Sequence, residues 1–150
     1  MRRKTPKVFL GTSVIFSAVL SPDGGARKLF QLGEAGVVSL CVGYHVLREC
    51  EEVVRRKATS SLSILARLLE LGGIETFPAP TREQMEVAHS IVAYEPDAYV
   101  LAEAIRAEPD WFITHDRAHF LNEKKVSGLR FQVGTPGDLI QSLINNFNLP

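Results

Sequence analysis

Short apolar runs alternate with amphipathic segments along the whole chain. Five runs are brief, apolar and bounded by turn residues, which predicts strands over residues 8–10, 37–42, 74–77, 111–114 and 129–133. Segments between them have helical spacing or capping signals and predict helices over residues 12–20, 26–35, 44–57, 61–71, 81–92, 96–107, 117–121 and 135–145. This alternation predicts an α/β protein, a three-layer α/β/α sandwich with a mostly parallel central sheet.

Length and composition fit one ordinary globular domain. The chain has 150 residues, of which 45% are hydrophobic and 23% are charged, and we expect a single domain over residues 1–150. No apolar run approaches the length of a membrane span, and the basic N-terminus lacks a signal-peptide cleavage site. We therefore expect a cytoplasmic protein without a membrane segment. Cys41 and Cys50 have no ligand-spaced partners and are expected to be reduced and buried.

The net charge indicates which kinds of nucleic-acid binding the protein could support. The formal net charge is +0, which argues against a protein coated in basic surface for duplex binding but permits a local basic rim. The run Arg55-Arg56-Lys57 is one of several small basic clusters, and by itself each cluster indicates solvated surface. Glu51 and Glu52 are placed to pair with Arg55 and Arg56 at i,i+4 spacing.

Three carboxylates stand apart from the other charges. Glu49 lies on the apolar side of its helix and lacks an obvious Lys or Arg partner, Asp97 lies in a first helical turn, and Asp116 follows a central-looking strand. Each has an ordinary interpretation: a snorkelling acid, an acid at a helix dipole, and an N-cap. Because ligands in parallel sheets bind beyond the carboxyl ends of strands, the three acids can converge on one cleft.

Converging carboxylates repel one another and normally need a cation. Oxygen ligands select Mg²⁺ or Mn²⁺ rather than zinc. Such a metal can orient a water molecule and stabilise a leaving oxygen during phosphodiester hydrolysis. His115 and His119 are four residues apart, but the break between strand and helix separates them, so we do not interpret them as a metal pair.

Four short motifs, in order, resemble those of PIN domains. Residues 8–15 (VFLGTSVI) resemble the opening strand with its Asp-Thr-Asn/Ser motif, and residues 46–49 (VLRE) resemble the second motif. Residues 96–104 (PDAYVLAEA) and 111–116 (WFITHD) resemble the third and fourth, and Thr135-Pro136 before the last helix also suits the family. The resemblance covers nearly the whole chain, from about residue 8 to about residue 140.

The resemblance implies a PIN-like fold and a metal-dependent nuclease that usually cleaves RNA. Many bacterial and archaeal members are VapC-like toxins, each held by a cognate antitoxin protein. By the same resemblance Glu49, Asp97 and Asp116 would be the catalytic and metal-binding residues for Mg²⁺ or Mn²⁺. Thr114 would support Asp116, with Thr12 and Ser13 near the site. A homodimer is expected, because PIN toxins commonly dimerise and one helix has an apolar stripe of Leu62, Leu65, Ala66 and Leu69.

Gly11 departs from the family pattern, which has its first Asp at this position. Glycine cannot coordinate a metal, so the resemblance predicts an attenuated or inactive enzyme with a weakly bound ion. As a second hypothesis, glycine there allows an anion to approach the following helix N-terminus closely. If Gly11 has a positive φ, a side chain at this position would be strained.

Two other functions compete with the attenuated nuclease. The first is a non-catalytic PIN-like protein that binds RNA or an antitoxin. The second is an unrelated doubly wound protein such as a signalling receiver, which also has carboxylates at strand ends. A receiver needs a lysine near a late strand, and no lysine in the last strands fits that requirement.

Overall fold

The five predicted strands form one parallel sheet. The computed structural model describes residues 5–116 and 128–147. Its strands are β1 (Lys7–Leu10), β2 (Ser39–Gly43), β3 (Glu75–Phe77), β4 (Trp111–Ile113) and β5 (Gln132–Gly134). They lie in the order β3-β2-β1-β4-β5, and each neighbouring pair is parallel. The chain builds outward from β1 in one direction and returns to its other side at β4, so β1 and β4 flank the topological switch point.

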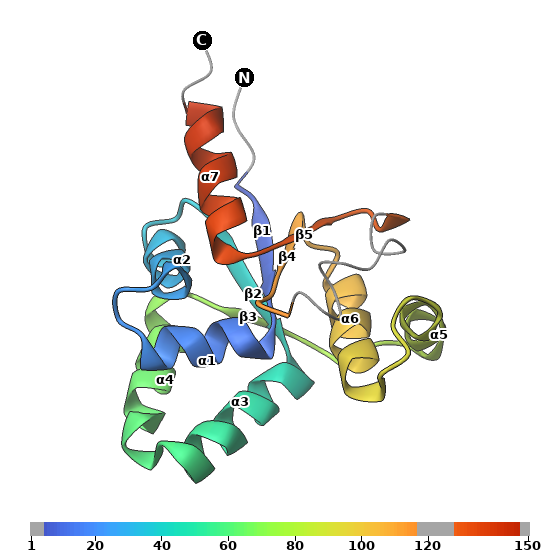
Figure 1. Cartoon of the computed structure of the whole chain (residues 1–150), viewed down its shortest axis with the longest axis horizontal. Helices are drawn as coiled ribbons and strands as arrows, with labels where there is room; N and C mark the ends of the chain where they lie inside the picture. Colours follow the sequence, from blue (N-terminus) through green and yellow to red (C-terminus); the bar gives the residue numbers. More distant parts are fainter. Residues whose placement is uncertain (1–4, 117–127, 148–150) are drawn as a thin grey trace.

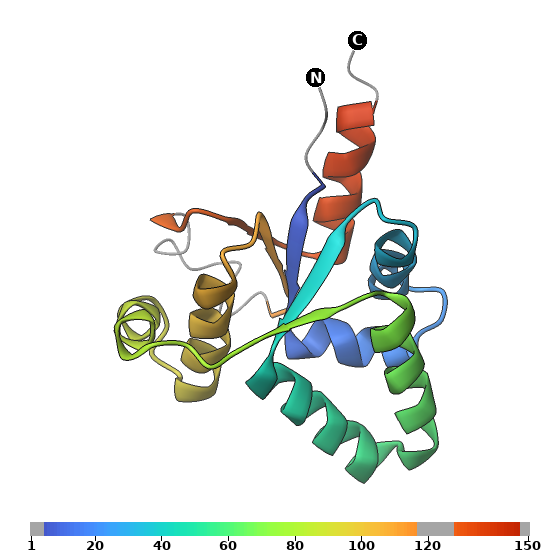
Figure 2. The same ribbon diagram turned by 180° about the vertical axis from the view of Figure 1, so that it is seen from behind.

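Helices cover both faces of the sheet, which confirms the predicted three-layer α/β/α sandwich (Figure 1). They are α1 (Thr12–Leu20), α2 (Gly25–Glu34), α3 (Tyr44–Lys57), the 3₁₀ turn η1 (Thr59–Ser61), α4 (Leu62–Leu71), α5 (Arg82–Ile91), α6 (Glu95–Ala107) and α7 (Pro136–Phe147). Helices α1, α2, α4 and α7 lie on one side and α5 and α6 on the other (Figure 2). Helix α3 lies at the edge where β2 ends and contacts both α1 and α6. No helix in the described residues is long and apolar enough to cross a membrane.

Local capping signals explain where several helices begin. The capping box predicted before α5 is present: the Gln84 backbone N–H donates to Thr81 Oγ1 at 3.2 Å and the Thr81 N–H donates to Gln84 Oε1 at 2.9 Å. Thr135 and Asp138 exchange the same two bonds at the start of α7. A proline in the first turn suits the start of α6, because the missing N–H has no intrahelical partner there.

The core is densest around β1 and β4. Phe9 and Phe112 are opposite each other in the register of these strands and are both fully buried. Their rings meet edge to face with centroids 5.7 Å apart. Burial of each such side chain contributes about 1.5–3 kcal/mol. Helices cover both faces of the two strands, and apart from Lys7 and the half-buried Trp111 at their starts all of their residues are buried and apolar.

Strand boundaries differ from the sequence prediction by more than one residue at two places, β2 and β5. Val37 and Val38 are apolar, but their N–H groups donate to the carbonyl of Leu32, so they close the end of α2 and β2 begins only at Ser39. The last strand begins three residues later than predicted, because the ladder with β4 starts at Gln132. The helix predicted over residues 117–121 lies outside the described residues.

Candidate functional site between β1 and β4

A pocket of about 350 Å³ opens at the switch point between β1 and β4. It is bounded by the starts of α1 and α6, one face of α3 and the loop after β4. All seven residues that the sequence analysis singled out line this pocket: Gly11, Thr12, Ser13, Glu49, Asp97, Thr114 and Asp116. Six other residues complete the lining: Phe16, Val53, Lys57, Pro96, Val100 and Phe112. The structure therefore brings the predicted positions to one place, and their catalytic and metal-binding roles remain a prediction.

The β1 side of the pocket presents backbone and hydroxyl groups. Gly11 follows β1 and is the N-cap of α1, with extended backbone at φ −78° and ψ 163°. The conjecture of a positive φ is therefore wrong, and backbone strain does not require glycine here. The Gly11 N–H donates to the Ile113 carbonyl at 2.9 Å, which ties this position to the end of β4. The Thr12 hydroxyl is buried and has no hydrogen-bond partner among the described residues.

The β4 side is organised by two hydroxyl groups. The Asp116 N–H donates to Thr114 Oγ1 at 3.0 Å, a local turn that fixes the backbone of Asp116. The His115 N–H donates to Ser13 Oγ at 3.1 Å, which joins the loop after β4 to α1. Thr114 is itself buried, with 2% of its surface exposed. These bonds hold the loop that carries Asp116 against the start of α1.

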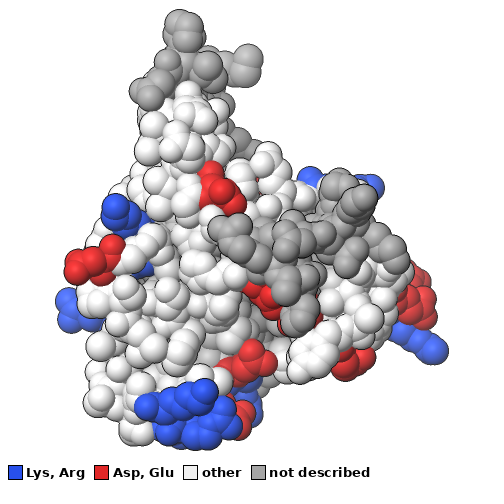
Figure 3. Space-filling model, viewed as in Figure 1, with Lys and Arg blue, Asp and Glu red and all other residues white. Residues whose placement is uncertain are grey.

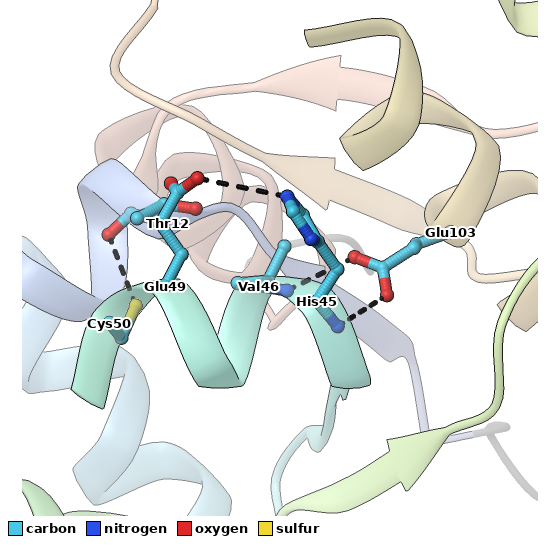
Figure 4. A network of polar contacts seen from close by, with 6 residues as sticks. All are labelled: Thr12, His45, Val46, Glu49, Cys50 and Glu103. Atoms are coloured by element: carbon cyan, nitrogen blue, oxygen red, sulfur yellow. Dashed lines mark hydrogen bonds and ion pairs between the residues drawn. The ribbon is translucent and has the colours of Figure 1, made fainter. Parts of the chain in front are cut away.

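The other two acids come from helices. Glu49 projects from α3 toward α1, near Thr12 (Figure 4). Its carboxylate lies 3.8 Å from His45 Nε2, one helical turn away, and 40% of the Glu49 side chain is exposed. His45 is thus the partner of an acid for which the sequence showed no Lys or Arg. Asp97 enters from the first turn of α6, directly after Pro96.

The oxygen atoms that line the pocket suit a hard divalent cation, but the acidic side chains are not arranged around a single metal position. Every side-chain donor that the pocket's acids and hydroxyl residues offer is oxygen, the element that Mg²⁺ and Mn²⁺ prefer. In residues 5–116 and 128–147, however, no three His, Cys, Asp or Glu side chains form a cluster that could hold a metal ion. The three carboxylates share the pocket without closing around one point, and Gly11 adds no donor at the end of β1.

Similarity to known proteins decides the family. The family profile described as PIN domain matches residues 7–118. The chain belongs to the PIN domain family. No curated protein sequence matches it.

Solved structures share the PIN fold at low sequence identity. VapBC2 from Rickettsia felis, solved bound to a DNA fragment from the promoter, superposes with a TM-score of 0.64 at 14% identity, over 85% of this chain and 98% of the other. VapC20 from Mycobacterium tuberculosis, a Sarcin-Ricin loop cleaving toxin, gives a TM-score of 0.53 at 15% identity, over 74% and 91% of the two chains. At these identities the likeness establishes the fold.

The PIN domain contains one buried carboxylate that the sequence motifs did not reveal. Glu103 of α6 is fully buried and accepts hydrogen bonds from the N–H groups of His45 at 2.8 Å and Val46 at 3.2 Å (Figure 4). It thereby caps α3, whose own N-cap, Gly43, has no side chain. Burial raises the pKa of Glu103 to about 7, against the two backbone hydrogen bonds, which lower it.

A signal for this cap was present in the sequence. The predicted helix at residue 44 follows a glycine rather than Ser, Thr, Asp or Asn, so its first N–H groups needed an acceptor from elsewhere. Glu103 lies between Ala102 and Ala104 on a helix that packs on the sheet, where an acid is out of place. In the sequence Glu103 is 60 positions from Gly43 and 58 positions from His45, so only the folded structure shows that it caps α3.

Neither the two cysteines nor His115 lines the pocket. Cys41 and Cys50 are free and buried, as expected. Burial raises the pKa of each thiol to about 12, so neither forms a reactive thiolate near neutral pH. His115 is exposed, and His119 lies outside the described residues.

Proposed function

We propose that this PIN domain is a divalent-metal-dependent ribonuclease of the toxin type, with activity weakened by glycine at position 11. The observation that carries the proposal is the pocket at the switch point, which is lined by Glu49 of α3, Asp97 of α6 and Asp116 after β4. Family membership supports it, since the same elements carry the matching motifs in order.

The three acids would hold Mg²⁺ or Mn²⁺. Such an ion supplies charge stabilisation and an oriented water for phosphodiester hydrolysis. The chain's own contribution is positional: Thr114 fixes the backbone of Asp116, and His45 steadies the carboxylate of Glu49. Leu10 and Ile113, the last residues of the two strands that flank the pocket, are fully buried.

Gly11 weakens this site by what it lacks. Gly11 lines the pocket at the end of β1, where a carboxylate would add negative charge and glycine adds none. Water can fill the position, yet it brings no charge and no fixed geometry. A misplacement of about 1 Å in a reacting group can lower a rate on the order of a hundredfold. We therefore expect slow cleavage and weak metal binding.

Two kinds of partner accompany this proposal. Toxin-type PIN proteins are expected to bind a cognate antitoxin, and the likeness to VapBC2 supports that expectation. A homodimer through α4 is also proposed. Leu65 is buried in the core whereas Ala66 is exposed, so only part of the predicted stripe is free to contact a second copy.

Cleavage of a mixed RNA substrate in Mn²⁺ and in EDTA tests the proposal. We expect slow, Mn²⁺-dependent cleavage by the unmodified protein and a loss of at least ~100-fold in the double variant Asp97→Asn with Asp116→Asn. Cleavage that persists in EDTA, or in the double variant, would come from a contaminant or from other residues and would contradict the proposal.

A non-catalytic PIN protein that binds RNA or an antitoxin is the second candidate. The lack of a closed acidic cluster among the described residues favours it. In the same assay it predicts no cleavage by the unmodified protein at any Mn²⁺ concentration, with RNA or antitoxin binding retained.

A further inference from the structure

We propose that α3 is a binding edge for single-stranded RNA, with a base-stacking end at its first turn and a phosphate-binding end at its last turn. The inference rests on the proposed nuclease function, because the reacting phosphodiester would lie at Glu49, between these two ends. It adds the part of the surface along which the RNA strand lies.

Two pockets meet along α3 and share one residue. The pocket with the acids also contains Val53 and Lys57, and a second pocket of about 400 Å³ is lined by Tyr44, His45, Arg48, Glu49, Glu52 and Tyr99. Glu49, Val53 and Lys57 follow one another at i,i+4 spacing and so lie on one face of the helix. At a rise of about 1.5 Å per residue, Lys57 lies about 12 Å along the axis from Glu49. The pockets thus form one continuous edge with Glu49 in its middle.

The first turn of α3 presents flat side chains to the second pocket. Tyr44 is 53% exposed, so its ring is accessible from solvent. The Arg48 guanidinium lies 5.8 Å from the centroid of the Tyr44 ring and donates to its hydroxyl at 3.2 Å. Tyr99 of α6 packs against His45 with ring centroids 4.5 Å apart. Unpaired bases stack on aromatic rings and on Arg planes, whereas bases inside a duplex are already stacked.

The last turn of α3 is basic and unpaired. Arg55, Arg56 and Lys57 are exposed, and Lys and Arg side chains gather over this end of the helix (Figure 3). The expected pairs of Glu51 with Arg55 and Glu52 with Arg56 do not form, and within the described residues none of the three cations makes an ion pair.

Lys57 is the member of this cluster that lines the pocket of the acids. The interpretation of the whole cluster as solvated surface is therefore incomplete. Phosphate groups would be repelled by the carboxylates alone, and a cation at one end of the same pocket offsets that repulsion.

Binding of a fluorescein-labelled RNA of eight uridines, followed by anisotropy at low ionic strength in Ca²⁺, tests the inference. Lys57→Ala should weaken binding about five- to tenfold and lower the slope of log affinity against log salt by about 0.7, the change expected for one lost contact to a single strand. Lys28→Ala is the matched control, because Lys28 is equally exposed but lies on α2 away from the pocket. It should change affinity less than twofold.

The stacking end has its own pair of variants. Tyr44→Ala should weaken binding at least about fivefold without changing the salt slope, since stacking of one base contributes about 1–3 kcal/mol. Tyr44→Phe keeps the ring and should bind like the unmodified protein. A duplex RNA of the same length should bind at least about tenfold more weakly than the single strand.

The outcomes separate this inference from the proposed function. Correct binding effects without any cleavage in Mn²⁺ would support the α3 edge and contradict the nuclease. Cleavage in Mn²⁺ together with unchanged RNA binding in both Lys57→Ala and Tyr44→Ala would overturn the α3 edge and leave the nuclease standing. Equal affinity for duplex and single strand, or no RNA binding at all, would also overturn it.

Discussion

Gly11 and Gly43 occupy matching places in the fold and differ in what surrounds them. Gly11 follows β1 and Gly43 is the last residue of β2, and each is the N-cap of the next helix, with extended backbone at φ −78° for Gly11 and φ −82° for Gly43. Neither offers a side chain to cap its helix. A sequence comparison would treat the two strand-to-helix junctions as equivalent.

At Gly43 the structure requires glycine, and at Gly11 it does not. A Cβ at Gly43 would overlap the carboxylate of Glu103, which caps α3 through the same space. A Cβ at Gly11 would lie 3.3 Å from the Ile113 carbonyl oxygen and 3.3 Å from the Phe112 ring, a tight fit that requires shifts of a few tenths of an ångström rather than the displacement of a carboxylate. The missing carboxylate at position 11 is therefore not imposed by the fold.

Gly43→Ala should have the largest effect on stability. The new methyl group would displace a buried carboxylate that holds two N–H groups, and we expect a loss of about 3 kcal/mol or more in the free energy of unfolding. Urea denaturation measures it. Gly137→Ala is the matched control, because a Cβ there would meet only Thr135 Oγ1 at 3.7 Å and helix propensity favours alanine.

A double-mutant cycle sharpens the same prediction. If Glu103 is what excludes a side chain at Gly43, Gly43→Ala should be nearly neutral in the background of Glu103→Ala, with a coupling free energy of about 3 kcal/mol. Strictly additive effects of the two changes would show that Glu103 does not determine the glycine.

Glu103 should make stability depend on pH. Its pKa is raised to about 7 in the folded protein from an ordinary value of 4.5, so the folded state binds more protons than the unfolded state between these values. Stability from this group is present below about pH 4.5 and is lost as pH rises through about 7. Each pKa unit corresponds to about 1.4 kcal/mol, and we expect a loss on the order of 2 kcal/mol over this range.

Glu103→Gln isolates that contribution. The amide is neutral at every pH and keeps one acceptor for the α3 N–H groups, so the variant should lose the fall in stability between pH 5 and 7. Unfolding in urea at several pH values provides the comparison. An unchanged pH profile in the variant would mean that the decline arises from other groups.

The fold was largely predictable because its signals are local. The predicted bounds of α1 and α3 agree with the structure, and a glycine immediately precedes each helix. The predictions failed where a contact distant in sequence or a turn overrode the local pattern. Val37 was predicted to belong to a strand because it is apolar. In the structure its N–H donates instead to the backbone carbonyl of Leu32 in the last turn of α2.

The candidate site was predictable where motifs follow strand ends and not where partners come from elsewhere. Asp116 could be placed because it follows a buried strand. His45 was not recognised as the partner of Glu49, and Glu103 was missed because its partners are 57 and 58 positions away in the sequence. The contribution of Lys57 depends on which face of α3 borders the pocket, which charge counting alone does not give.

Mn²⁺ binding by Gly11→Asp, measured by calorimetry beside Gly11→Asn, tests the central claim most directly. Both variants add similar bulk and a good N-cap residue, so both should stay within about 1 kcal/mol of the unmodified protein in stability, while only Asp adds charge at the pocket. We predict that Gly11→Asp binds Mn²⁺ at least about tenfold more tightly than Gly11→Asn, a difference of about 1.4 kcal/mol. Adding Asp97→Asn should abolish the gain. If Gly11→Asp folds normally and binds Mn²⁺ no more tightly than Gly11→Asn, position 11 does not belong to a metal site and the account of an attenuated nuclease is wrong.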